Sequence, residues 1–322
     1  MAENLNPTSQ QKEKFSPERK FRAMIEQIWL KAVRFYTYNS PIDRGKYRLF
    51  QLALRLCRYL PTEIKTQTRD GRNLSANLTT GMNTTVFFLG EYEKSPTKIV
   101  LSLLKSGDVC LDAGANFGWY TTLFYKHCGA AGAVHAFEPV PMSFEELRRN
   151  YKLMGAPKNV FINNLALGER CGEITINLFP NQPTGHASVS RHGKDDFVSF
   201  QCKMITLDSY LEKNNLEQVD FVKLDIEGAE MMFFKGAEKL FKQTMPPIWL
   251  IEMALEQTRN FGYLPNDLIN FMRERAAYDF YKVNEIKATL KKIEGFSSED
   301  IGANVVCIPR ELNGNLAGLL FE

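Results

Sequence analysis

The strongest constraint on how this chain can fold is an alternation of short apolar segments with amphipathic segments that begins at Asp108. Apolar runs of about five residues bounded by turn formers are typical of buried strands. Strands that are buried on both faces and separated by helices form a mainly parallel sheet between two layers of helices. We therefore expect an α/β fold. The strands are expected at 109–113, 133–137, 160–167, 219–224 and 248–253, and the helices at 119–128, 142–154, 231–241 and 266–275.

Two further pairs of strands are expected around this pattern. Residues 174–179 and 197–204 flank a polar loop, and residues 280–283 and 305–308 form the last pair. The last two strands are short and joined by a stretch rich in lysine and glutamate, which suits an antiparallel edge of the sheet.

The chain is expected to divide into a polar tail (1–17), a basic helical segment (18–61), a catalytic domain (62–312) and a C-terminal tail (313–322). Residues 1–60 contain 12 lysines and arginines against 5 acidic residues, a local net charge of +7. Such a segment is either a solvated basic face on a packing helix or a cap that contacts an anionic surface or acceptor. Peripheral contact with a membrane through these basic helices belongs to the second interpretation.

Apolar residues at spacings of three and four predict one face of a first helix, and they are Phe21, Ile25, Ile28, Trp29, Ala32 and Tyr36. A second helix is expected over 46–60, where Pro61 stops it. After it, Asp70-Gly71 predicts a hairpin turn, and 86–89 is expected to be a strand. Ser95 is expected to cap a helix that runs to Lys105.

Composition excludes several classes of protein. The chain has 322 residues, is 44% hydrophobic and carries a net charge of +3, which is too small to indicate a nucleic-acid partner. No apolar run approaches the ~20 residues that cross a bilayer, and the N-terminal residues lack the apolar stretch of a secretion signal. The six cysteines form no CxxC pair, so free thiols are favoured over disulfides or a zinc site. We expect a cytoplasmic protein.

The sequence Asp112-Ala113-Gly114-Ala115-Asn116-Phe117-Gly118 follows a predicted strand and opens a predicted helix. Gly114 would allow a tight turn and a close approach of the backbone to a ligand. Glu138, at the end of the next strand, is placed to accept hydrogen bonds from two ribose hydroxyls. An adenosine-containing cofactor is therefore expected.

The acid in this turn discriminates between cofactors. A dinucleotide site has the pattern G-x-G-x-x-G facing a pyrophosphate, whereas here Asp112 precedes a G-x-x-x-G spacing. A carboxylate repels a pyrophosphate and attracts a cation. S-adenosylmethionine carries a sulfonium and an ammonium and no phosphate, so it is favoured over a nicotinamide dinucleotide or ATP.

Six motifs occur in order, namely DAGANFGWY, HAFEP, NLALGE, TLDSY, KLDIEGAE and IWLIE. Together they resemble the FkbM-type family of class I S-adenosylmethionine-dependent methyltransferases, over roughly residues 85–255. The resemblance implies a Rossmann-like, mainly parallel seven-stranded sheet whose last strand is antiparallel. It implies nothing about residues 1–60.

The resemblance also implies roles for individual residues. The residues that would line the methionine and ribose part of the cofactor are Asp112, Gly114, Ala115, Asn116 and Gly118. Glu138 would hold the ribose hydroxyls, and Pro139 would flank the adenine. Asn164 to Ala166 would meet the adenine edge, and Asp225 would face the transferred methyl group or the acceptor.

Asp225, at the tip of the fourth strand, and the neighbouring Glu227 are candidates for the catalytic machinery. Glu227 and Glu230 also suit the first turn of a helix, where the dipole favours acids. Glu252 is a weaker candidate. His186, in the loop between the two extra strands, is the histidine chosen to contact the acceptor, although loop histidines are commonly only solvated. No residue pattern indicates a metal site.

The expected function is S-adenosylmethionine-dependent O-methylation of a hydroxyl on a glycan or secondary metabolite, with Asp225 or His186 as general base. An N-methyltransferase acting on a peptide side chain shares the same cofactor site and is the nearest alternative. A non-catalytic binding module that retains the fold is an alternative from a different class. A nicotinamide oxidoreductase is disfavoured by the turn chemistry.

Overall fold

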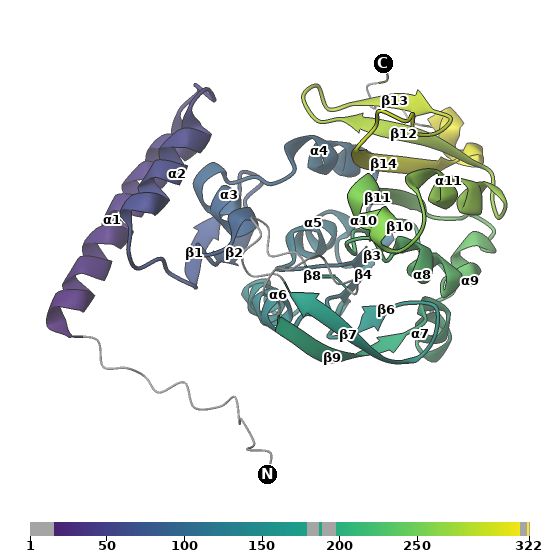
Figure 1. The fold of residues 1–322 in the computed structure, drawn as a ribbon, viewed down its shortest axis with the longest axis horizontal. Coiled ribbons are helices and arrows are strands. Elements are labelled where there is room, and N and C mark those ends of the chain that lie inside the picture. The colour runs from purple at the N-terminus through teal and green to yellow at the C-terminus, as the bar shows by residue number, and fades with distance from the viewer. Residues whose placement is uncertain (1–15, 179–186, 189–197, 316–320, 322) are drawn as a thin grey trace, which may run out of the picture. The chain divides into compact units, whose positions relative to one another are not determined.

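The central element of the computed structural model is an eight-stranded sheet, counted over the described residues, which are 16–178, 187–188, 198–315 and 321 (Figure 1). Its strand order is β13-β12-β14-β11-β10-β3-β4-β5. The strands are β3 (Val109–Ala113), β4 (Ala133–Phe137), β5 (Val160–Asn163), β10 (Phe221–Leu224), β11 (Ile248–Ala254), β12 (Tyr278–Asn284), β13 (Thr289–Ile293) and β14 (Gly302–Pro309). Strands β3, β4, β5, β10 and β11 are parallel, whereas β14 is antiparallel to both of its neighbours, β11 and β12. The expected α/β class is confirmed, and β13 adds an edge strand within the segment expected to join the last two strands.

Helices cover both faces of this sheet because alternate strand residues point to opposite sides. Leu111 and Trp249 pack into one core with apolar side chains of α7, α8, α9 and α11. Cys110 and Leu250 pack into a second core with α4 and α5. These helices are α4 (Lys94–Leu103), α5 (Trp119–Cys128), α7 (Leu207–Lys213), α8 (Glu230–Lys235), α9 (Glu238–Phe241) and α11 (Pro265–Arg273). Further helical segments are α6 (Pro141–Leu153), α10 (Leu255–Asn260) and η1 (Arg310–Asn315).

A small second sheet contains the expected extra pair of strands. Its order is β6-β9-β7-β8, with β6 (Ala166–Leu167), β7 (Gly172–Leu178), β8 (Ala187–Ser188) and β9 (Val198–Ile205). The single strand expected over 160–167 is therefore two strands, β5 and β6, in different sheets. Strand β5 ends just before Asn164. The side-chain nitrogen of Asn164 donates to the carbonyl oxygens of Glu138 and Pro139 at 2.8 and 3.1 Å.

Two expectations for the segment between the β1–β2 hairpin and the eight-stranded sheet were wrong. Residues 86–89 belong to helix α3 (Gly81–Leu89), not to a strand. This helix is buried on several sides, so its apolar run has no helical period, and Asn83 binds Glu146 at 2.9 Å inside the protein. Ser95 does not cap α4, which starts at Lys94, two residues earlier than expected, with Glu93 at its N-cap. The Ser95 hydroxyl instead donates to the carbonyl oxygen of Glu285 at 2.6 Å.

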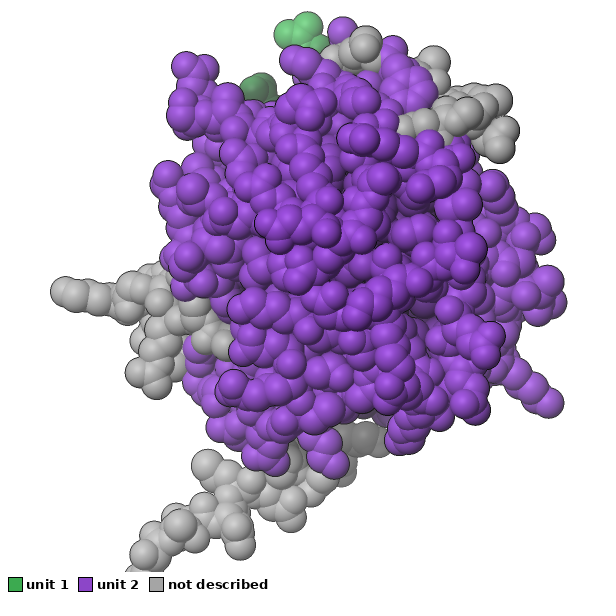
Figure 2. Space-filling model, turned by 90° about the vertical axis from the view of Figure 1, so that its right-hand side faces the viewer, with its two compact units in different colours: residues 1–62 green, residues 63–322 purple. Residues whose placement is uncertain are grey.

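The chain divides into two units, Met1–Thr62 and Glu63–Glu322, and Figure 2 shows the larger unit in purple. The smaller unit is a pair of helices, α1 (Pro17–Asn39) and α2 (Lys46–Leu56). Leu30 and Val33 of α1 and Phe50 of α2 are buried. Helix α2 ends before Leu60 because the Glu26 carboxylate accepts the backbone N–H groups of Arg58 and Tyr59.

The apolar face expected on the first helix exists, but it is not the buried one. Phe21, Ile28 and Tyr36 are more than half exposed, whereas Leu30 on the other side of the helix is fully buried. No helix in the described ranges is both long enough and apolar enough to cross a membrane.

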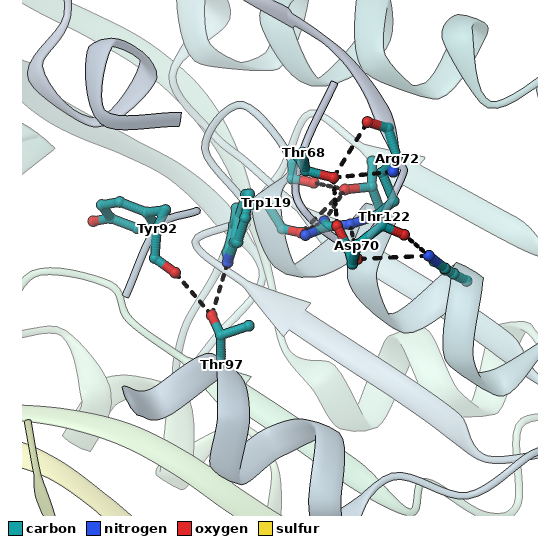
Figure 3. A network of polar contacts seen from close by, with 9 residues as sticks. Thr68, Asp70, Arg72, Tyr92, Thr97, Trp119 and Thr122 are labelled. Atoms are coloured by element: carbon teal, nitrogen blue, oxygen red, sulfur yellow. Dashed lines mark hydrogen bonds and ion pairs between the residues drawn. The ribbon is translucent and has the colours of Figure 1, made fainter. Parts of the chain in front are cut away.

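The hairpin of β1 (Ile64–Gln67) and β2 (Asn73–Ala76) forms as expected around Asp70-Gly71. Its Arg72 is buried, pairs with Asp70 at 2.7 Å, and donates to the Trp119 carbonyl oxygen and the Thr122 hydroxyl at 2.7 and 2.6 Å. The guanidinium also lies 4.2 Å from the centre of the Trp119 ring. Figure 3 shows that the Trp119 indole N–H continues this network to Thr97. The hairpin therefore fixes the N-terminal turn of α5.

We expect Arg72→Met to lower the free energy of unfolding by about 2 kcal/mol, because the apolar side chain leaves Asp70 and the Trp119 carbonyl oxygen without this donor. Urea denaturation followed by circular dichroism measures the change. Arg259→Met, at an exposed position on α10, is the matched control and should change stability by less than about 0.5 kcal/mol. Equal stability losses in the two variants would contradict the structural role of Arg72.

Candidate active site

A cavity of about 220 Å³ lies at the carboxyl ends of β3, β4, β10 and β11. Tyr92 and Glu93, just before α4, and Ile174 and Ile176, on the small sheet, also line it. Ligands of open α/β sheets bind at this edge. The cavity is therefore the candidate active site.

The turn after β3 can lie against the backbone of Asp225 only because residue 114 is glycine. Gly114 has φ of 82°, and a Cβ atom there would lie 1.8 Å from the carbonyl oxygen of Asp225. The backbone N–H groups of Gly114 and Ala115 donate to the carbonyl oxygen of Phe137 at 3.0 and 2.9 Å. The turn thus links the ends of β3, β4 and β10 at the wall of the cavity.

Glu138 is buried at the end of β4 and lines the cavity. Its two carboxylate oxygens accept the backbone N–H groups of Asn116 and Val140 at 2.7 and 2.8 Å. Burial raises the pKa of Glu138 to about 7, with smaller contributions from the charges of Asp112 and Asp225, although the two backbone hydrogen bonds oppose the shift. Each oxygen keeps a second lone pair that can accept a ligand hydroxyl.

Asp112 is also buried and lines the same cavity. Its carboxylate accepts the Thr121 hydroxyl at 2.5 Å. Burial raises the pKa of Asp112 to about 6, while the Thr121 hydrogen bond and the charge of Lys223 act in the opposite direction.

Most of the residues expected to bind the cofactor line the cavity, namely Asp112, Gly114, Ala115, Asn116, Glu138, Pro139, Ala166 and Asp225. Gly118 and Asn164 are outside its lining of described residues. A Cβ atom at Gly118 would lie 2.7 Å from a Leu147 methyl carbon, so this glycine allows α5 and α6 to pack closely. Asn164 braces the strand end after Glu138 through the two hydrogen bonds given above.

Three ionisable groups meet at the tips of β10 and β11. The Lys223 ammonium is fully buried and lies 3.1 Å from the Asp225 carboxylate. Glu252 forms a hydrogen bond with Asp225, and the negative charge of Asp225 followed by burial raises the pKa of Glu252 well above its usual range. Two carboxyl groups can hydrogen-bond only when one of them carries a proton. The pair therefore holds one proton and one negative charge beside Lys223.

The loop after β10 is held by Glu230, which is buried. One Glu230 oxygen accepts the backbone N–H groups of Ile226 and Gly228 at 3.3 and 3.2 Å. The Tyr263 hydroxyl lies 2.9 Å from the other oxygen. Burial raises the pKa of Glu230 to about 7. Within this loop Glu227 has φ of 57°, lines the cavity and accepts a hydrogen bond from the Gln257 amide.

Sequence reasoning missed several lining residues, chiefly Tyr92, Glu93, Tyr120 and Lys223. The lysine within the otherwise apolar strand Phe221–Leu224 indicates a charged partner nearby, because a lysine is rarely fully buried without one. The Tyr120 hydroxyl donates to Glu93 at 2.6 Å, a contact between segments with no common sequence pattern. His186 lies outside the described residues, which in this loop include only β8.

The acids of the cavity suit a cationic cofactor. Its described lining contains six acidic side chains, Glu93, Asp112, Glu138, Asp225, Glu227 and Glu252, against one lysine, Lys223. Such a cavity attracts a sulfonium and an ammonium and repels a phosphate. The residues therefore fit S-adenosylmethionine. In the described ranges there is no group of three or more His, Cys, Asp or Glu side chains arranged to hold a metal ion.

A model of the methyltransferase FkbM domain matches residues 112–280, more than half of the chain. The matched range begins at Asp112 and includes the expected motifs around Glu138 and Asp225.

Two curated relatives are similar to part of this chain. The hexuronic acid methyltransferase AglP of Haloferax volcanii is 29% identical over 144 residues, which cover 45% of this chain and 56% of AglP. The methyltransferase sdnD of Sordaria araneosa is 27% identical over 163 residues, covering 42% of this chain and 62% of sdnD. The chain thus spans less than two thirds of the length of either relative.

Among solved structures, the chain is similar to methyltransferase FkbM from Methylobacillus flagellatus KT. The TM-score is 0.41 and the identity 16%, over 64% of this chain and 44% of that chain.

The raised pKa of Glu138 predicts that S-adenosylmethionine binds less tightly as the pH falls below about 7. We expect the ribose hydroxyls to donate to the ionised carboxylate, so a protonated Glu138 would have to lose its proton on binding, at a cost of at most about tenfold in affinity per pH unit. Calorimetric titration over a pH series measures this slope. Glu138→Gln should bind more weakly and with a flatter pH dependence, and an unchanged slope in this variant would rule out Glu138 as the titrating group.

Proposed function

Because the chain belongs to the methyltransferase FkbM family, we propose that it is an S-adenosylmethionine-dependent O-methyltransferase whose acceptor is a hydroxyl of a glycan or secondary metabolite. We assign the activity to residues 62–312 and treat the basic helices as an addition to this domain. In this assignment Glu138 holds the ribose hydroxyls and the turn at Gly114 lies along the methionine part. Asn116 and Pro139 flank the nucleoside. S-adenosylmethionine, when bound, supplies an electrophilic methyl group on a sulfonium sulfur.

The observation that carries this proposal is the carboxyl pair Asp225–Glu252 at the cavity wall. We assign the negative charge of the pair to Asp225, because the pKa of Glu252 is raised well above its usual range and the Lys223 ammonium lies 3.1 Å from Asp225. The glycine turn brings this pair to the same cavity as Glu138. A proton acceptor thus lies in the cavity that would hold the methyl donor.

In the proposed reaction the acceptor oxygen forms a bond to the methyl carbon while the carbon–sulfur bond breaks, and the sulfur keeps the electron pair. The hydroxyl proton becomes strongly acidic as its oxygen gains this bond. Asp225 takes the proton, while Lys223 keeps the carboxylate in position. General-base assistance of this kind contributes ~10²–10⁴-fold to the rate. His186 remains a second candidate for a group that contacts the acceptor.

Two observations support an acceptor that carries several hydroxyls. Glu93 and Glu227 also line the cavity, and carboxylates accept hydrogen bonds from neighbouring sugar hydroxyls. The relative AglP is named for methyl transfer to a hexuronic acid.

A transfer assay with S-[methyl-³H]adenosylmethionine against sugars, hydroxylated metabolites and peptides tests the assignment. A methyl ether on oxygen survives mild alkali, whereas a methyl ester on a carboxylate is hydrolysed. The proposal expects alkali-stable label on a hydroxyl-bearing acceptor. Label on a peptide nitrogen would establish N-methylation instead, and tight cofactor binding without any transfer would favour a binding module.

We expect Asp225→Asn to lower turnover by at least ~10² with little change in affinity for S-adenosylmethionine, because the amide cannot take the acceptor proton. Glu252→Gln should shift the pH dependence of turnover, since it removes the second titrating member of the pair. Single-turnover kinetics measure both effects. Glu217→Gln, at an exposed position, is the matched control for Glu252→Gln. Parent-like turnover in Asp225→Asn would leave Asp225 without a catalytic role.

A further inference from the structure

Helix α1 carries two separate apolar faces. Leu30 and Val33 form the inner face and are buried. The outer face is aromatic and aliphatic, and each of its large side chains is 43% to 70% exposed. These residues are Phe21, Ile25, Ile28, Trp29, Phe35 and Tyr36.

The outer face is continuous. At 100° per residue its six side chains fall within a sector of about 120°, away from the sector of the inner face. From Phe21 to Tyr36 it runs for about 22 Å along the helix axis. Single exposed apolar side chains are ordinary, but contiguous apolar patches on soluble proteins commonly mark an interaction surface.

Basic side chains border this apolar face. Lys20 and Lys31 are exposed and fall on one flank of it by their helical positions. The segment 1–60 as a whole has the net charge of +7 noted above. A helix with an aromatic and aliphatic face bordered by lysine and arginine is typical of segments that lie in the headgroup region of an anionic bilayer. Tryptophan and tyrosine favour the same region.

We propose that helix α1 docks, through its outer face, on a bilayer surface that contains anionic lipids. Charge decides between this occupant and a second copy of the chain, because two segments of net charge +7 repel each other whereas an anionic headgroup layer attracts both the charge and the apolar face. The charged residues within α1 place the helix along the surface of the bilayer rather than across it. This proposal is independent of the acceptor proposed above.

The tryptophans of the chain provide a direct readout. Of the three, Trp119 and Trp249 are 4% and 0% exposed, whereas Trp29 on the outer face is 43% exposed. Adding vesicles of phosphatidylcholine and phosphatidylserine to the full chain should shift the emission to the blue and protect it from acrylamide. Vesicles of phosphatidylcholine alone should have a much smaller effect, and added salt should weaken binding. Trp29→Phe should remove the spectral change while vesicle co-sedimentation persists.

Matched substitutions separate the outer face from a general effect of charge. Ile25→Glu combined with Ile28→Glu should weaken co-sedimentation with the anionic vesicles by at least about tenfold. Ile286→Glu combined with Ile301→Glu makes the same chemical change at positions that are 95% and 83% exposed in the larger unit, and it should bind as the parent does. Lys20→Gln with Lys31→Gln should weaken binding, whereas Lys213→Gln with Lys291→Gln should not. Circular dichroism checks that the variants stay folded.

Several outcomes would overturn the proposal. Equal affinity for neutral and anionic vesicles, or no binding to either, would exclude an anionic bilayer as the occupant. Trp29 emission that is already blue and resistant to acrylamide without vesicles would show that the face is covered by protein. Sedimentation equilibrium that finds a dimer in the parent and a monomer in Ile25→Glu/Ile28→Glu would identify the occupant as a second copy.

Discussion

The site depends on one close approach, between the turn after β3 and the backbone just beyond β10. The position of the Asp225 carbonyl oxygen leaves no room for a side chain on Gly114. The Asp225 N–H in turn donates to the Ala113 carbonyl oxygen at 3.1 Å. The N–H groups of the two residues after Ala113 donate to the Phe137 carbonyl oxygen. Three parallel strands are thereby fixed at their ends relative to one another. Asp112, Glu138 and Asp225 belong to different strands or loops, and this contact is what places all three in one cavity.

The electrostatics of the cavity follow from that placement. Acids gathered in a buried space disfavour one another's ionisation, which is why burial and neighbouring carboxylates raise the pKa values of Asp112 and Glu138. The pKa of Glu252 is raised as well, first by the negative charge of Asp225 and then by burial. Burial lowers the pKa of Lys223, but the charges of Asp225 and Glu93 outweigh this effect and raise that pKa overall, so the lysine keeps its charge. The net charge of the cavity therefore depends on what is bound in it, because a bound cation favours the ionised forms of the acids.

The sequence alone predicts the secondary structure correctly where a local pattern of residues determines it. Apolar runs such as Phe221–Leu224 can only be buried strands in this context, and the turn at Gly114 follows from its glycine and its place after a strand. The predictions failed where tertiary contacts decide. The run at Val86 becomes helical because it is buried on several sides, and Asn164 divides one apolar run between two sheets through contacts with a neighbouring strand end. The exposed face of α1 obeys the helical period perfectly well, but periodicity alone cannot say which of two apolar faces is covered. Lys223 and Tyr120 line the cavity, although the sequence pattern places their strand and helix only in the core.

The position of β14 has a consequence for how the protein is made. This strand lies between β11 and β12, yet the ribosome synthesises it after both of them. Until β14 emerges, each of its partners presents an open edge of unpaired N–H and C=O groups, which is a template for association with other chains. Completion of the sheet is therefore a late event in biosynthesis. A nascent chain that has finished β12 but not β14 therefore exposes two strand edges that the complete sheet pairs.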